Sequence, residues 1–198
     1  MGIELEYAEG QTPIDEDEKN GLLIPEITTR AELDEFEQWN IEQAVQWSLT
    51  KTFKPEAIVS EVFMRELHKR MFGRVWAWAG EFRKTDKNIG VEKWQISIEL
   101  KKLIDDTLYW IANKSYEPDE IAIRFKHRLV SIHCFANGNG RHSRLLADII
   151  AEKIFNRPVF SWGANSIKDP KELRKSYIHA LRAADKGDYR ALVEFGRG

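Results

Sequence analysis

Residues 133–144 read HCFANGNGRHSR, a glycine-rich turn between two stretches with helical periodicity. The stretch before the turn begins at Pro118, and its apolar residues recur on one helical face, at Ile121, Phe125, Leu129 and Ile132. The stretch after the turn is expected to be helical from about Asn139 to Asn156. The turn therefore joins two predicted helices.

The turn has the composition of an anion-binding site. Gly138 and Gly140 permit backbone angles that other residues avoid, so that successive N–H groups can face one concavity. The following helix adds unpaired N–H groups and the positive end of its dipole. Arg141 and Arg144 are three positions apart and are expected on one face of its first turn. Two guanidiniums above such a concavity would clamp a polyphosphate.

His133 stands at the edge of this predicted site. A neutral imidazole there could take a proton from a hydroxyl that attacks phosphorus. The alternative for this histidine is a purely structural role. Cys134, the chain's single cysteine, is expected to be small filler in a tight loop rather than a nucleophile. No carboxylate lies within the twelve residues, and Asn137 occupies the place where a metal-binding acid could stand.

Composition indicates an ordinary globular protein. The 198 residues suit one domain with a short appendage, and the net charge of -2 argues against a nucleic-acid binder. The first ten residues lack the pattern of a secretory signal, and no apolar stretch approaches the roughly 18 residues of a membrane span. We therefore expect a soluble, cytoplasmic protein with no membrane partner.

The remaining sequence predicts a mainly α fold, because strand signal is sparse. Residues 1–27 are polar and acidic and are expected to form an extended arm. Residues 28–50 should form a helix that opens with a capping box, Thr29 with Glu32, and buries an apolar stripe. That stripe comprises Leu33, Phe36, Ile41, Val45 and Trp47. Further helices are expected after residue 54 and over about 97–113, 169–184 and 187–195.

HCFANGNGRHSR also resembles the signature of the Fic family, H-x-F-x-(acid)-G-N-G-R-x-x-R, and matches it everywhere except at Asn137. ELHKRMFGRVWAWAGEFR at 66–83 and YIHALRAADKGDYRALVEF at 177–195 resemble the family's entry and closing segments. The resemblance covers about residues 50–196. It implies a Fic domain at 51–198, built as a helical bundle with a short β-hairpin flap. The chain is also similar to the small mobile mystery protein B subgroup.

The resemblance implies an enzyme that transfers AMP from ATP to a hydroxyl of a target protein. His133 would be the general base, and Phe135 would anchor the loop in the core. Gly138, Asn139 and Gly140 would hold the α- and β-phosphates. Arg141 would stabilise their charge in transfer, and Arg144 would pair with the γ-phosphate. The flap at residues 86–97 would dock a segment of the target as an added strand.

Asn137 departs from the family pattern, in which an acid holds Mg²⁺. An amide oxygen can ligate Mg²⁺ or Mn²⁺ but brings no charge, so the nucleotide would hold the ion largely by itself. Slower transfer, another phosphate-containing donor, or a nucleotide-binding module without turnover all remain open. Such a module would suit a toxin–antitoxin pair or a mobile element. A kinase or a phosphocholine transferase on the same scaffold is a further alternative.

The resemblance also implies a possible inhibitory helix, because many Fic proteins carry one whose glutamate pairs with the second signature arginine and displaces the γ-phosphate. Two glutamates in the 28–50 helix are candidates here, Glu32 and Glu37. Glu32 has the spacing from Thr28 but is already explained as a helix cap, which leaves Glu37 as the better candidate. The alternative for both is a solvated acidic helix face.

Overall fold

The computed structural model describes residues 15–166 and 169–198. The described residues are mainly helical, as predicted, and pair as strands only at an isolated bridge between Leu22 and Trp76. The elements are α1 (Glu16–Lys19), α2 (Arg30–Thr50), α3 (Pro55–Ile58), α4 (Glu61–Phe72), the 3₁₀ helix η1 (Lys93–Gln95), α5 (Ile96–Asn113), α6 (Pro118–Ile132), α7 (Asn139–Ile149), the π-helical turn η2 (Ile150–Ile154), α8 (Pro170–Ala184) and α9 (Arg190–Arg197).

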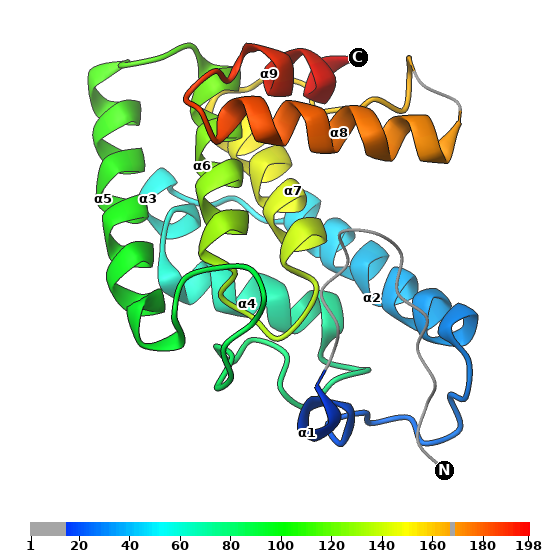
Figure 1. Ribbon diagram of the computed structural model, residues 1–198. Coiled ribbons are helices and arrows are strands. Elements are labelled where there is room, and N and C mark those ends of the chain that lie inside the picture. Colours follow the sequence, from blue (N-terminus) through cyan, green and yellow to red (C-terminus); the bar gives the residue numbers. More distant parts are fainter. Residues whose placement is uncertain (1–14, 167–168) are drawn as a thin grey trace.

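The helical pair α6 and α7 forms the centre of the molecule. The two helices lie side by side, and the turn that joins them faces α4 and α1 at one end, while α8 and α9 lie across the other end (Figure 1). Aromatic and aliphatic side chains from α4, α6 and the turn fill the space between them, among them Phe72, Leu67, Phe125 and Phe135. Burial of this size, about 1.5–3 kcal/mol per large side chain, holds the turn against a rigid base.

The buried face of α2 agrees with the predicted stripe only in part. Leu33 is buried, and Ile41 and Trp47 are partly buried against the core. The residues buried on α2 are Leu33, Glu37, Asn40, Ala44 and Ser48, whereas Phe36 is 44% exposed. Three of the five are polar, and each has a hydrogen-bond partner. Asn40 Nδ2 donates to the Phe36 carbonyl and Ser48 Oγ to the Val45 carbonyl. Hydropathy does not predict that these polar side chains are buried, because the hydrogen bonds that make their burial possible appear only in the folded structure.

The expected β-hairpin flap is absent from residues 86–97, which form bends followed by η1 and the start of α5. Side chains take the backbone groups that a hairpin would pair. The Arg83 guanidinium donates to the carbonyls of Thr85 and Val91. The Asp86 carboxylate accepts from the Lys93 N–H. The flap is therefore a loop pinned by side chains.

A search of the helices within 15–166 and 169–198 finds none with the length and apolar character that a membrane crossing requires.

Candidate active site

Backbone conformation sets the shape of the turn between α6 and α7. α6 ends in a left-handed residue, His133, with φ of 58°. Gly138, which precedes α7, has φ of 77°, and a Cβ there would lie 2.6 Å from the Phe72 ring. Gly138 thus needs to be glycine for both reasons. Gly140 lies within α7 and has no left-handed angle, which corrects the expectation that both glycines serve the turn conformation.

The Asn139 side chain braces the turn from inside. Its Oδ1 accepts from the Phe135 N–H at 2.9 Å, and its Nδ2 donates to the Phe135 carbonyl at 2.8 Å. Both ends of the amide therefore bind the backbone of one residue, Phe135, and Asn139 is 5% exposed. In this arrangement the amide fixes the loop, and an anion would meet the backbone instead.

His68 and Phe135 support the turn from below. Phe135 is 1% exposed and its ring stacks on the His68 imidazole, with centroids 3.7 Å apart. The Gly80 N–H donates to His68 Nδ1, so Nε2 carries the hydrogen and donates to the Asn137 carbonyl. Burial holds the pKa of His68 well below its usual range, which keeps the ring neutral. No metal or catalytic role follows for this histidine, and its contacts are structural.

The His133 imidazole is neutral at physiological pH. Burial lowers its pKa to about 4, the nearby charges of Arg83 and Lys87 act in the same direction, and a hydrogen bond to the Val130 backbone opposes them. A neutral imidazole is the form that accepts a proton. The residue as a whole is 5% exposed.

Arg83 is a residue of the site that sequence reasoning missed, apart from its place in the WAGEFR segment. Its Nε donates to the His133 carbonyl at 2.7 Å, and its backbone N–H donates to the Cys134 carbonyl at 2.9 Å. Its side chain is fully buried. From the sequence alone, Arg83 cannot be told from an ordinary surface cation, and only the fold shows that it positions His133.

Cys134, next to His133, is buried. Burial raises the pKa of its thiol to about 12, which excludes a thiolate nucleophile.

The start of α7 offers backbone donors to an anion. Helix geometry leaves the N–H groups of the first turn, at Asn139, Gly140 and Arg141, without an intrahelical acceptor. A Cβ at Gly140 would meet no atom within 4 Å, so the space beside this turn is open. The N-terminal end of the helix dipole adds a partial positive charge. These features suit phosphate oxygens.

Arg141 is bound by a glutamate of α2. Its Nη1 lies 2.5 Å from Glu37 Oε2, and the other carboxylate oxygen accepts from Trp76 Nε1 at 2.6 Å. Glu37 is 2% exposed, whereas the Arg141 side chain is 30% exposed. The glutamate is therefore held by the core, and the arginine reaches it from the rim of the site.

Arg144 points to a different neighbour. Its guanidinium lies 5.6 Å from the Tyr177 ring on α8, where the Tyr177 hydroxyl also accepts from the buried Lys126. Arg141 contacts α2 and the Phe72 ring. Both arginines of the predicted clamp lie near the start of α7, but their side chains contact different helices. Arg141 contacts α2 and Arg144 contacts α8.

Glu32 and Asn137, the remaining predicted site residues, accept hydrogen bonds from backbone N–H groups close to them in sequence. Glu32 is exposed and its Oε2 accepts from the N–H groups of Thr28 and Thr29, as the capping box predicted. Asn137 Oδ1 accepts from the Gly138 N–H at 2.7 Å. Within the described ranges no three His, Cys, Asp or Glu side chains are grouped to hold a metal ion. The chain therefore offers Mg²⁺ one neutral oxygen and no carboxylate at this turn.

Comparison with known proteins agrees with this geometry. Residues 58–151 match the model of the Fic/DOC family, a range that contains α4, the flap, the turn and α7. The chain belongs to the Fic/DOC family. The match includes the turn, and the helical fold is shared with solved Fic structures.

Two kinds of relative extend the comparison. The protein adenylyltransferase Fic of Drosophila grimshawi is 34% identical over 134 residues, which is 66% of this chain and 26% of that protein. The chain thus spans about a quarter of the length of this relative. Among structures, residues 134–508 of Fic-1 from C. elegans align with a TM-score of 0.66 at 26% identity, covering 89% of this chain and 50% of that one. BepC from Bartonella tribocorum, solved with AMPPNP, has the same TM-score at 17% identity, covering 91% and 96%.

Proposed function

We propose that this chain transfers AMP from ATP to a hydroxyl side chain of a target protein. One observation carries the proposal: a neutral His133 stands beside an open helix N-terminus that holds both signature arginines. Relatives named protein adenylyltransferase Fic are similar to about two thirds of the chain. The fold is also that of a protein whose structure holds AMPPNP. The cytoplasm is the proposed site of the reaction.

The proposed reaction is displacement at the α-phosphorus. The hydroxyl oxygen of the target attacks, the bond from phosphorus to the bridging oxygen breaks, and diphosphate leaves with the electron pair. His133 removes the hydroxyl proton as the oxygen attacks. Arg83 contributes by fixing the His133 carbonyl, and so the start of the turn, at 2.7 Å. Positioning and charge neutralisation supply most of the rate in reactions of this kind.

The phosphates are assigned to the start of α7. The backbone N–H groups of Asn139 and Gly140 would bind the α- and β-phosphates, next to the Gly138 turn. Arg141 would stabilise charge on those phosphates, and Arg144 would reach the γ-phosphate after leaving the Tyr177 ring. The Asn139 amide keeps the turn in shape while they bind.

Mg²⁺ or Mn²⁺ is assigned chiefly to the nucleotide. Asn137 is the residue of this chain that would ligate the ion, and its amide oxygen is already engaged with the Gly138 N–H. The ion, when bound, neutralises phosphate charge. Because the turn supplies no carboxylate, the chain's own contribution to metal affinity is small.

Glu37 is the proposed internal brake on this site. Its carboxylate occupies the Arg141 guanidinium that the phosphates need, and Trp76 holds it there. ATP must therefore displace a buried ion pair before it gains its own contact with Arg141. The brake differs from the family pattern stated above, since the glutamate meets the first signature arginine. Glu32 serves the helix cap and takes no part in it.

Intact-mass spectrometry tests the proposal most simply. The wild type, His133→Ala and Asn137→Asp would each be incubated with ATP, GTP, CTP or UTP and Mg²⁺ or Mn²⁺. We expect a nucleotide adduct on the wild type or on Asn137→Asp, strongest with ATP, and none on His133→Ala. An adduct that persists on His133→Ala would contradict the assignment of the base.

A nucleotide-binding module without turnover is the second candidate. The Glu37–Arg141 pair and the amide at Asn137 favour it, because each weakens the site without removing it. In that case calorimetry should show ATP binding while neither the wild type nor Asn137→Asp gains an adduct.

A further inference from the structure

The proposed base is covered in this structure. His133 is 5% exposed, and the flap passes directly over it, so close that a Cβ on Gly90 would lie 2.6 Å from His133 Cβ. The Val91 N–H donates to the Ile132 carbonyl at 3.3 Å. Little of the His133 surface is therefore open to an incoming hydroxyl in this arrangement. The flap must move for a target to be modified, so whatever fastens it controls access.

One fastening is internal to the flap and its stem. The fully buried Arg83 side chain binds the carbonyls of Thr85, Val91 and His133 together. Thr85 and Val91 stand on either side of Lys87 in the chain, so these contacts tie both flanks of this lysine to the turn. They leave the Lys87 side chain itself to be held by other groups.

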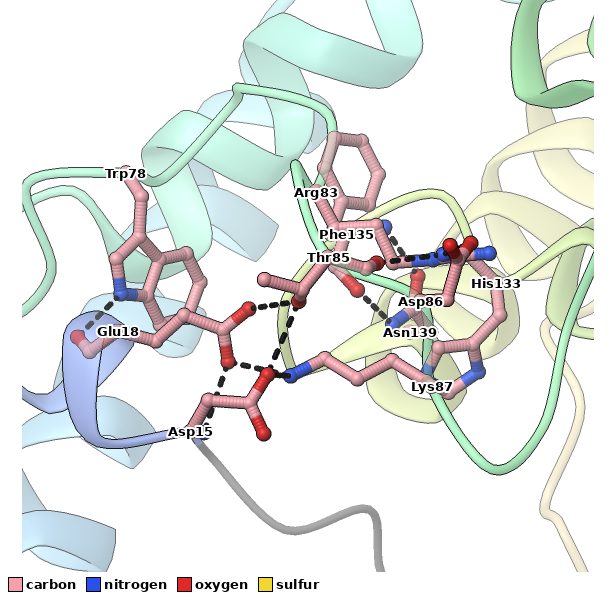
Figure 2. Close-up of polar contacts among 10 residues, drawn as sticks. All are labelled: Asp15, Glu18, Trp78, Arg83, Thr85, Asp86, Lys87, His133, Phe135 and Asn139. Carbon is pink, nitrogen blue, oxygen red and sulfur yellow. Dashed lines mark hydrogen bonds and ion pairs between the residues drawn. The ribbon is translucent and has the colours of Figure 1, made fainter. Parts of the chain in front are cut away.

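The second fastening comes from the N-terminal segment. Lys87 extends from the start of the flap beside His133, and its ammonium lies between the carboxylates of Asp15 and Glu18, at 2.7 and 2.6 Å (Figure 2). The Thr85 hydroxyl lies 3.0 and 3.1 Å from oxygens of the same two carboxylates. The Lys87 side chain is 3% exposed, whereas that of Lys84, three residues earlier, is 86% exposed. A lysine buried to this degree needs its charge balanced, and both balancing charges come from about 70 residues away.

The N-terminal segment is itself anchored to the domain, by contacts that do not involve the flap. The Leu23 N–H donates to the Val75 carbonyl and the Ala77 N–H to the Gly21 carbonyl, both at 2.8 Å. Trp78 Nε1 donates to the Glu18 carbonyl at 3.0 Å. Residues 15–27, hereafter the strap, are thus tied to the segment that follows α4 and reach across to Lys87.

We infer that the strap is a regulatory fastening that holds the flap closed over His133 through Asp15, Glu18 and Lys87, and that it releases Lys87 when a target enters. The inference rests on the proposed function, which makes His133 the group that a target must reach. The closed state also keeps the imidazole desolvated, so opening both uncovers the base and strengthens it. The hydrogen bond from Lys87 lowers the pKa of Asp15, and the Thr85 hydroxyl and the Lys87 charge act in the same direction, so the contact stabilises the charged carboxylate.

Acylation of His133 by diethyl pyrocarbonate, which modifies neutral accessible imidazoles, tests the strap directly. The probe needs no nucleotide, and peptide mass spectrometry reads each histidine separately. The exposed His179 and the buried His142, 1% exposed, serve as internal references within the same chain. The test variant is the pair Asp15→Asn with Glu18→Gln, which removes both charges. The Gln amide oxygen can still accept from the residue 15 N–H, as Glu18 does in the cap of α1.

We expect the rate of His133 acylation to rise about tenfold in the double variant, corresponding to about 1.4 kcal/mol on the opening equilibrium. Lys87→Met should give the same rise from the flap side, and the triple variant should give no more. Glu16→Gln is the matched control: it lies on the same helix, its side chain is 85% exposed and it pairs with Lys19, so the rate should not change.

A wild-type rate of His133 acylation in the double variant would overturn the strap, even if Lys87→Met failed to fold. An equal rise in Glu16→Gln would also overturn it, because the effect would then be one of general charge. Failure of the transferase proposal would look different. In that case His133 would be acylated faster in the strap variants, but no variant would form a nucleotide adduct. The strap would then be supported and the proposed AMP transfer would be wrong.

Discussion

The signature turn and the N-terminal region differ in how they form the site. The turn, residues 133–144, contains two arginines and no carboxylate, and its geometry comes from contacts within the domain, such as Asn139 with Phe135. The N-terminal region, residues 15–50, supplies the acids: Glu37 to Arg141, and Asp15 with Glu18 to Lys87. The residues assigned to the reaction thus lie within one short stretch of sequence. The acids that bind Arg141 and Lys87 come from positions far away in the chain.

This difference predicts opposite effects of substitutions in the two regions. Changes in the turn should remove activity or stability, since its groups are assigned to the chemistry and to the packing beneath it. Changes in the N-terminal acids should leave the fold intact and raise activity. A result of the wrong sign in either region would break the distinction.

The largest effect is expected at His133. His133→Ala should lower the rate of AMP transfer by about a thousandfold, because the positioned base that takes the hydroxyl proton is lost. Transfer can be followed with ATP labelled on the α-phosphate. His179→Ala, at an exposed position of α8, is the control and should keep full activity. Equal loss in both variants would remove His133 from its assigned role.

His68→Ala should destabilise the fold by about 3 kcal/mol, since a buried ring with two hydrogen bonds and a stacked partner is replaced by a cavity. Urea denaturation measures the change. His179→Ala is again the control and should shift the unfolding free energy very little. A stable His68→Ala variant would mean that the turn does not depend on this support.

Stability should fall as the pH drops from about 6.5 towards 4. Burial lowers the pKa of His133 and of His142 to about 4, so the unfolded chain binds protons in this range that the native chain does not. Asp148 opposes the trend, because burial raises its pKa to about 6. Urea midpoints at pH 7 and pH 5 check the net sign, and an unchanged or higher midpoint at pH 5 would contradict it.

Glu37→Gln should raise ATP affinity about tenfold. The change frees Arg141 of its competing carboxylate, and a hydrogen bond between charged groups contributes about 1.5–3 kcal/mol. The Gln oxygen can still accept from Trp76, so the core contact is retained. Calorimetry measures the affinity, and Glu35→Gln, exposed on the same helix, is the matched control. Equal affinities in Glu37→Gln and wild type would show that the ion pair is not a brake.

Asn137→Asp should have the smallest effect, a few-fold tighter apparent Mg²⁺ binding in the presence of ATP, because a carboxylate adds charge to a site that the nucleotide dominates. Titration of transfer with Mg²⁺ would measure it. No shift in the Mg²⁺ dependence would mean that residue 137 does not reach the ion.

The sequence predicted the parts of this molecule that depend on local pattern. Helical periodicity placed α5 and α6 close to their observed bounds, and the capping box placed the start of α2. The periodicity also placed the start of α7, but α7 ends at Ile149 and gives way to the π-helical turn η2 before the predicted end at about Asn156. The family signature likewise located the turn. Each of these is decided by residues within a few positions of one another.

Properties that depend on distant contacts were harder to predict. Part of the buried face of α2 was not predicted, because Glu37, Asn40 and Ser48 are polar and their partners are visible only in the fold. The hairpin flap was expected from the family resemblance, whereas Arg83 binds two of the carbonyls in this region. No prediction was made for Lys87 from the sequence, because the two carboxylates that bind it lie about 70 residues earlier in the chain.

The most direct test of the account combines the two regions in one experiment. Glu37→Gln and the double variant Glu37→Gln/His133→Ala would be incubated with ATP and Mg²⁺ and weighed by intact-mass spectrometry. The account predicts an AMP adduct on the first protein, more than on the wild type, and none on the second. An equal adduct on both proteins, or none on either while both bind ATP, would contradict it.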